Sequence, residues 1–122
     1  MGLIRIIQGD ITQLPVDAVV KTCNWKKDDH VSGRSIGQAV LANGHEIPAK
    51  YIIHTTGPVW QGGNDNEDQL LASCYRNTLK LALENGIKTL AFPSLEELHY
   101  KFPVRRAARI AILEISDFLE EN

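Results

Sequence analysis

Residues 66–93 decide the fold of this 122-residue chain, and they read NEDQLLASCYRNTLKLALENGIKTLAFP. Mostly apolar residues recur at helical spacing through the first part of this segment, at Leu70, Leu71, Cys74, Tyr75, Thr78, Leu81 and Ala82. Gly86 stands where a left-handed residue commonly ends a helix. With Asn64 or Asp65 as the N-cap, the segment predicts an amphipathic helix.

Short apolar and β-branched runs on both sides of this helix predict strands. The run at 89–92 follows the helix and is stopped by Pro93, and the run at 51–55 precedes it. Because a strand, a helix and a second strand in one sheet join by a right-handed crossover, these two strands should be parallel. Further strands are expected at residues 3–7, 16–20 and 38–42.

Two more features complete the expected α/β fold. The short connection between the runs at 38–42 and 51–55, with a turn at Asn43 and Gly44, favours an antiparallel pair. Pro103 begins a last helix, whose apolar stripe includes Val104, Ala107, Ala108, Ala111, Ile115, Phe118 and Leu119. The sequence therefore predicts one mixed sheet with helices packed on it.

The composition is that of a single globular domain, 1–122. Hydrophobic residues make up 43% and charged residues 23%, which excludes disordered and collagen-like classes. A formal net charge of -2 gives no bulk attraction to nucleic acid or membranes. No run has the length of a membrane span or a secretory signal, so a cytoplasmic location is expected. Cys23 and Cys74 should be reduced, with Cys74 as a helix core residue.

Neither a metal nor a cofactor is expected. His45 and His54 have no Cys or carboxylate partners at the spacing of metal ligands. Three arginines mark one side of the last helix, and a solvated face that pairs with Glu114 or its neighbours is favoured over nucleic-acid contact for Arg105, Arg106 and Arg109. Function should instead be sought where ligands bind α/β sheets, in the loops at the carboxyl ends of the strands.

Those loops resemble the ligand loops of a macrodomain, the α/β module that recognises ADP-ribose. The matching segments lie in the expected order over about four-fifths of the chain. They are residues 8–12 (QGDIT), 16–20 (VDAVV), 47–60 (IPAKYIIHTTGPVW), 66–71 (NEDQLL), Cys74-Tyr75, Ala91-Phe92-Pro93, Pro103 and Ala107-Ala108. The resemblance implies a three-layer mixed sheet with helices on both faces.

The resemblance also implies part of a ligand site. Asp10 would contact the adenine amino group, Ile11 would add a backbone contact beside it, and Asn24 would hydrogen-bond a ribose hydroxyl. Two plainer interpretations stay open, because Asp10 is equally suited to capping a short turn at 11–13 and Asn24 to an ordinary loop turn.

The segment after the second strand departs from the family. The usual Asn-Ala-Ala-Asn is replaced by Lys21, Thr22, Cys23 and Asn24. Family members then have a glycine-rich loop and a helix with the acidic residue proposed as catalytic in several branches, but residues 25–36 are too few for both. No residue inherits the catalytic role, so we expect no catalytic residue.

The diphosphate loop departs further. Family members typically show Ser-Thr-Gly, one residue and Tyr-Gly, whereas this loop has no glycine; its residues expected around the phosphates are Ser94, Leu95, Glu96, Glu97, Leu98, Tyr100 and Phe102. A phosphate cradle needs inward backbone N–H groups and close approach of the main chain, which glycine permits. The phosphate site is therefore expected to be impaired.

The family usually continues with another strand, between the first strand and the one at 88–92, and with a final helix, and Asn122 precedes both. Unless the first strand moves across to close this gap, two strand edges remain unpaired. Unpaired strand edges recruit other chains, so a homodimer through open edges is then expected. Two functions remain. The favoured one is a pseudo-macrodomain of ADP-ribose-binding ancestry, without hydrolase activity and with weak or lost binding. The alternative is a functional module for ADP-ribose or a related adenine nucleotide, with ADP-ribosyl hydrolysis as its activity.

Overall fold

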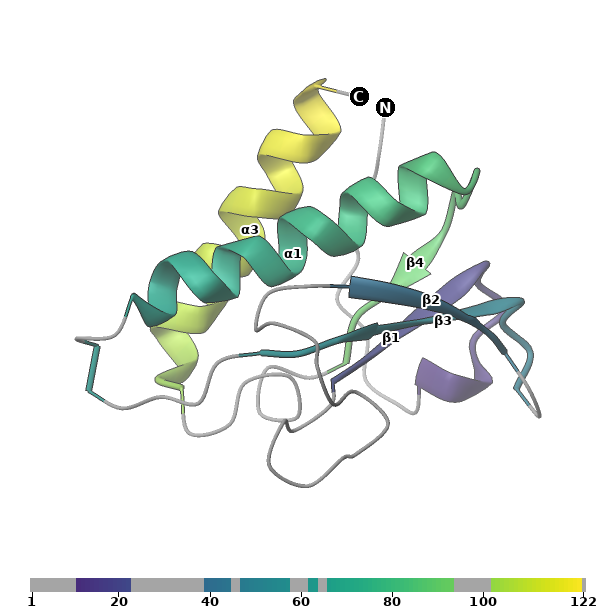
Figure 1. The fold of residues 1–122 in the computed structure, drawn as a ribbon, viewed down its shortest axis with the longest axis horizontal. Helices are drawn as coiled ribbons and strands as arrows, with labels where there is room; N and C mark the ends of the chain where they lie inside the picture. The colour runs from purple at the N-terminus through teal and green to yellow at the C-terminus, as the bar shows by residue number, and fades with distance from the viewer. Residues whose placement is uncertain are drawn as a thin grey trace.

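The computed structural model describes residues 11–22, 39–44, 47–57, 62–63, 66–93 and 102–121. The strand expected at 3–7 lies outside these residues. Along the chain the elements are η1 (Ile11–Gln13), β1 (Ala18–Thr22), β2 (Ala39–Asn43), β3 (Tyr51–Thr55), α1 (Glu67–Glu84), β4 (Leu90–Ala91) and α3 (Val104–Glu121) (Figure 1). No helix of these described parts is long and apolar enough to cross a membrane.

The four strands form one mixed sheet in the order β2-β3-β1-β4. β1 runs parallel to both β3 and β4, with Val20 beside Ile53 and Val19 beside Ala91. β2 pairs antiparallel with β3, so the mixed α/β sheet and its hairpin are confirmed. At the hairpin, Gly44 donates its N–H to the Lys50 carbonyl at 2.9 Å. A Cβ on Gly44 would lie 2.1 Å from the Ala49 carbonyl oxygen, so this close approach requires glycine.

Two strand boundaries differ from the prediction for a physical reason. β1 begins at Ala18 rather than at Val16, and β4 has only two residues. Just before both strands, the Asp17 carboxylate accepts the N–H groups of Lys88 at 2.8 Å and Thr89 at 3.2 Å. The Asp17 N–H in turn donates to Thr89 Oγ1 at 2.8 Å. A side chain therefore joins the two segments where the sequence pattern suggested a continuing ladder.

The start of α1 corrects the expected cap. Asn66 is the N-cap, rather than Asn64 or Asp65, and it has a left-handed backbone with φ of 59° and no side-chain capping hydrogen bond. At the other end Gly86 has the expected positive φ, 68°. The helix therefore occupies the predicted segment, but the Asn66 side chain does not cap its first turn.

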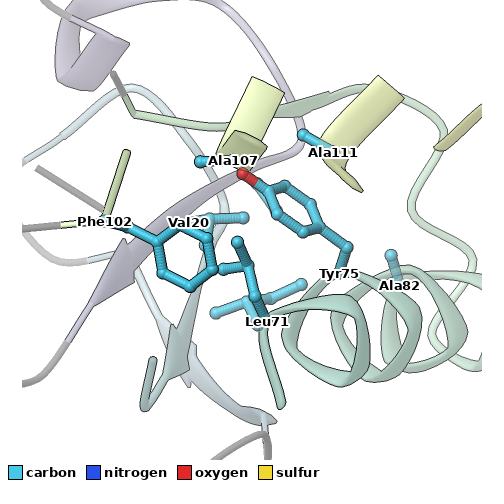
Figure 2. Close-up of a cluster of buried hydrophobic side chains, with 9 residues drawn as sticks. Val20, Leu71, Tyr75, Ala82, Phe102, Ala107 and Ala111 are labelled. Carbon is cyan, nitrogen blue, oxygen red and sulfur yellow. The ribbon is translucent and has the colours of Figure 1, made fainter. Parts of the chain in front are cut away.

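Both α-helices lie on one side of the sheet, and α1 packs against α3 (Figure 1). Between them and the strands lies the main core, where Tyr75 and Leu71 of α1 meet Val20 of β1 and Ala107 and Ala111 of α3 (Figure 2). Cys74 is buried on α1 as predicted. On the other side of the sheet, a smaller cluster is formed by Val19, Ala49 and Ile52.

The expected apolar stripe of α3 is only partly a core stripe. Ala107 and Ala111 are its buried residues, while Val104 is 53% exposed. The small alanine side chains let α3 approach Tyr75 closely, so these positions carry the contact with α1 and the sheet. The more apolar positions 112 and 113, which the stripe left out, are exposed as well.

Candidate functional site

The candidate site is the sheet edge where the three parallel strands end. β1, β3 and β4 run in one direction, so Thr22, Thr55 and Ala91 close their strands at the same edge. Most of the expected ligand residues follow these strands in the sequence, outside the described residues. At the end of β3, Thr55 and Thr56 are both buried, so this part of the edge is tightly packed. Open α/β sheets bind ligands at such edges.

The loop after β3 is tied to α1 at both of its ends. At its start, the Cys74 thiol donates to the Thr56 carbonyl, with 3.4 Å between sulfur and oxygen. At its end, the Gly63 N–H donates to Glu67 Oε2 at 2.9 Å. Gly62 and Gly63 have φ of 97° and 91°, a conformation that other residues adopt at a cost.

Glu67 is the residue at this edge that sequence reasoning underestimated. It is only 2% exposed, although it lies in the first turn of α1, where an acidic side chain is ordinarily a surface charge near the helix dipole. Its carboxylate accepts a backbone N–H of the preceding loop, which an exposed first-turn glutamate would not do. The pair of glycines four and five residues before it was the available signal, since glycines mark a tight loop that needs an anchor.

The loop after β4 is anchored on both sides by aromatic residues. Phe92 lies beside Tyr75, with 5.1 Å between the ring centroids and a tilt of 45°. Phe102 is 5% exposed and belongs to the main core (Figure 2). Burial, with a smaller contribution from Cys74, raises the pKa of the Tyr75 phenol, which stays neutral. Phe92 and Phe102, which flank residues 94–101 in the sequence, therefore both pack in the main core.

The expected ligand residues divide into two groups. Ile11 opens η1, so the short turn expected at 11–13 is present as a 3-10 helix, and Phe102 supports the core. The other residues lie outside the described parts of the chain, and their ligand contacts stay predictions: Asp10, Asn24, Ser94, Leu95, Glu96, Glu97, Leu98 and Tyr100.

Two surface hollows lie along α1, and none of the expected ligand residues lines either of them. One lies between α1 and α3 and is lined by Asp68, Gln69, Ala72, Ser73, Arg76 and Glu114. The other lies beside α1 and β2, where Ala39 meets Leu81. Within the described ranges, no three His, Cys, Asp or Glu side chains gather as metal ligands do.

The arginines of α3 have other partners than expected. Arg106 donates to Asp68 of α1, with 2.7 Å from Nε to Oδ1, rather than pairing with Glu114. Glu114 instead accepts from Arg76 of α1, at 2.9 Å from Nη2. The Asp68 hydrogen bond raises the pKa of the Arg106 guanidinium further above its ordinary value. Both ion pairs join residues that are 38 positions apart in the sequence. Such an equal separation is expected when the two helices run in the same direction.

Known proteins match this chain over nearly its whole length. The Macro domain family model matches residues 5–111. A macro domain-containing protein of Methanosarcina mazei is 42% identical over 140 residues, which cover 98% of this chain and 75% of that protein. A protein of Escherichia fergusonii named O-acetyl-ADP-ribose deacetylase is 39% identical, over 98% of this chain and 81% of its own.

Solved structures give the same result. The Oceanobacillus iheyensis macrodomain with ADP has a TM-score of 0.80 and 30% identity, covering 93% of this chain and 75% of that one. The Trypanosoma brucei macrodomain in complex with ADP-ribose has a TM-score of 0.79 and 31% identity, covering 94% of this chain and 56% of that one. The order of strands and helices, the sequence and the fold thus agree, and the chain belongs to the macrodomain family.

Proposed function

We propose that this chain is a macrodomain of ADP-ribose-binding ancestry that binds ADP-ribose weakly or not at all and has no hydrolase activity. The observation that carries the proposal is the sequence Glu96-Glu97-Leu98 in the loop between β4 and α3. The resemblance to macrodomains implies that the diphosphate of the ligand would lie against that loop. Two carboxylates and bulky side chains stand there in this chain.

The cost of this replacement is large compared with a typical binding energy. A non-glycine residue such as Leu98 in a left-handed conformation costs roughly 1 to 2 kcal/mol. A carboxylate within about 5 Å of a phosphate charge adds roughly 3 kcal/mol of repulsion at an effective dielectric near 20. A micromolar affinity is worth only about 8 kcal/mol, so these effects together remove most of it.

One basic side chain close to this loop in the sequence is already engaged by a carboxylate. Arg106 lies near the start of α3, shortly after this loop. Its guanidinium already donates two hydrogen bonds to the Asp68 carboxylate. To neutralise Glu96 or Glu97, Arg106 would have to give up those bonds. The loop is also held between buried Phe102 and Phe92, which packs on Tyr75, so large displacements of its ends would disturb the core.

The absence of hydrolysis is supported by what stands after β1. Lys21, Thr22 and Cys23 replace the family's usual residues there, and residues 25–36 are short for the loop and helix that carry the catalytic acid in several branches. The alignment with the Methanosarcina mazei protein runs over 140 residues, more than the 122 of this chain. Within the aligned region, the relative therefore has residues that have no counterpart in this chain.

A second function, a working reader of ADP-ribose or another adenine nucleotide, has its own support. Asp10 and Ile11 match the family's adenine corner, and η1 begins at Ile11. The structural relatives include macrodomains with ADP and with ADP-ribose. A chain that keeps this corner would hold the adenine end of a nucleotide even where the diphosphate end is lost.

Calorimetric titration with ADP-ribose separates the two functions. The comparison uses the unaltered chain and the triple variant Glu96→Ser, Glu97→Thr and Leu98→Gly. We expect binding weaker than about 1 mM for the unaltered chain and at least tenfold tighter binding for the variant. Micromolar binding by the unaltered chain would overturn the proposal. Glu84→Ser, an exposed change on α1, is the control and should leave binding unaltered.

A further inference from the structure

Helix α3 has a second face with a regular pattern of side chains, on the side opposite to its core contacts. Six positions form this face, and we call them the outer α3 face: Arg105, Arg109, Ile112, Leu113, Ser116 and Glu120. At about 100° of rotation per residue, they fall within an arc of about 100°. Ala107 and Ala111, which pack against α1 and the sheet, lie across the helix from them.

The outer α3 face is exposed and its charges are unused. Ile112 is 54% exposed and Leu113 is 55% exposed, and they are adjacent, so their side chains form one apolar spot. Arg105, Arg109 and Glu120 are exposed and make no ion pair among the described residues. Arg106, which turns toward α1, is by contrast paired with Asp68. The described parts of the chain therefore leave this face, with its apolar spot and its charges, open for binding.

The order of chemistry along this face is self-complementary. It runs from basic (Arg105, Arg109) through apolar (Ile112, Leu113) to acidic (Glu120). Arg105 and Glu120 are equally distant in sequence from the midpoint between Ile112 and Leu113. Fifteen residues of helix separate them by roughly 22 Å, so they cannot pair within one chain. Two copies placed antiparallel about that midpoint would bring each Arg105 opposite the other copy's Glu120.

We propose that the outer α3 face binds a second copy of this chain, with the two α3 helices antiparallel about a two-fold axis between Ile112 and Leu113. This contact is isologous, because the same patch serves on both copies, and it closes at two subunits. The apolar spots meet at the axis, and two Arg105–Glu120 pairs flank them. It is distinct from pairing through a sheet edge, since no strand takes part.

The size of the face sets the strength of the contact. A single helix pair buries less than the roughly 1,200 Å² of a standard stable interface, so the dimer forms at protein concentrations of roughly 0.1 to 1 mM. Exposed ion pairs are screened by salt, so dissociation should increase between low and high ionic strength.

The test is a charge-reversal cycle followed by sedimentation equilibrium. The two-fold contact contains two Arg105–Glu120 pairs. Arg105→Glu alone, or Glu120→Arg alone, replaces both pairs by like charges and should raise the dimer dissociation constant roughly tenfold. The double variant restores opposite charges and should recover most of the affinity. Lys80→Glu and Glu84→Arg, exposed reversals on α1, are matched controls and should leave the constant unchanged.

A second variant keeps the proposal falsifiable if a reversal disturbs folding. Leu113→Lys puts a charge on the axis beside its own copy and should leave only monomer, with an unchanged circular dichroism spectrum because the position is exposed. A chain that is monomeric at 1 mM, or a dimer that is insensitive to all three outer-face variants, would overturn the proposal. If the double variant folds but does not recover the dimer affinity, this result would also contradict the antiparallel arrangement.

Discussion

Asp17 shows how one exposed carboxylate joins β1 to β4. It accepts the Lys88 and Thr89 N–H groups, and these backbone hydrogen bonds, Lys88 first, lower its pKa below the ordinary value of 3.8. A carboxyl whose pKa is lower in the folded state stabilises the fold above its unfolded pKa, and this contribution is lost as the pH falls through the folded value. The stabilising effect of Asp17 is therefore fully present at pH 7, begins to decline below about pH 4 and is lost as the pH falls through the lowered folded pKa.

Asp17→Asn should lower the urea midpoint at pH 7, because an amide is a weaker acceptor than a carboxylate for two N–H groups. The difference from the unaltered chain should shrink when both are measured at pH 3. Asp117→Asn, an exposed change on α3, is the control and should show no such closing gap. A midpoint difference equal at pH 7 and pH 3 would contradict this role for Asp17.

Thr78 presents a different residue-level problem, since its hydroxyl is fully buried and has no hydrogen-bond partner among the residues that the structure describes. Thr78→Val removes the unsatisfied hydroxyl and keeps the shape, so we expect about 1 kcal/mol of added stability in denaturant unfolding. Thr78→Ser keeps the hydroxyl, removes a buried methyl group and should be destabilising. A less stable valine variant would mean that the hydroxyl has a partner in solution.

Glu67 links α1 to the loop at the ligand edge. Glu67→Ala leaves the Gly63 N–H without its acceptor and opens a space at a 2% exposed position, so it should cost about 2 to 3 kcal/mol of stability. The amide proton of Gly63 should also exchange faster with solvent. Glu84→Ala, at the exposed end of the same helix, should change stability by less than about 0.5 kcal/mol. Unchanged exchange at Gly63 would show that the loop is held by other contacts.

At the next level, α1 and α3 are held together by buried contacts more than by their ion pairs. The Arg76 side chain is 63% exposed and that of Glu114 20% exposed, so this pair is largely solvated. A double-mutant cycle with Arg76→Ala and Glu114→Ala should give a coupling energy of about 0.2 to 1 kcal/mol, decreasing with added salt. Tyr75→Ala, which empties the core between the helices, should cost far more, about 3 to 5 kcal/mol. An ion-pair coupling above 2 kcal/mol would reverse that order.

The helices and strands themselves were largely predictable, whereas the side-chain contacts between them were not. Helix α1, the β2–β3 hairpin and the parallel direction of β3 and β4 follow from local periodicity and connection lengths, whereas the place of β1 between β3 and β4 was not predicted. The pairing of Arg106 with Asp68 depends on how α3 lies against α1, and no local pattern specifies that. The same holds for Val104, whose place in an apolar stripe did not reveal that α3 turns it to solvent. Tertiary packing decided both.

The molecule as a whole keeps the macrodomain fold, and we propose that it combines this fold with altered ligand loops. The parallel strands still bring their ends to one edge, with η1 following the residues that match the adenine corner. The edge was predictable because it follows from topology. Contacts of Asp10, Asn24 and residues 94–100 were not, because loop conformation has no periodic signal in the sequence.

This combination predicts how the chain treats fragments of its family's ligand. If only the adenine end is recognised, AMP and ADP-ribose should bind with dissociation constants within about threefold of each other, both weak, because the second phosphate and distal ribose add nothing. Chemical-shift titration with both ligands measures such millimolar binding. The triple variant at 96–98 is the internal comparison, since regaining a phosphate cradle should tighten ADP-ribose at least tenfold and AMP much less. ADP-ribose binding more than tenfold tighter than AMP in the unaltered chain would mean that the acidic loop still holds the diphosphate.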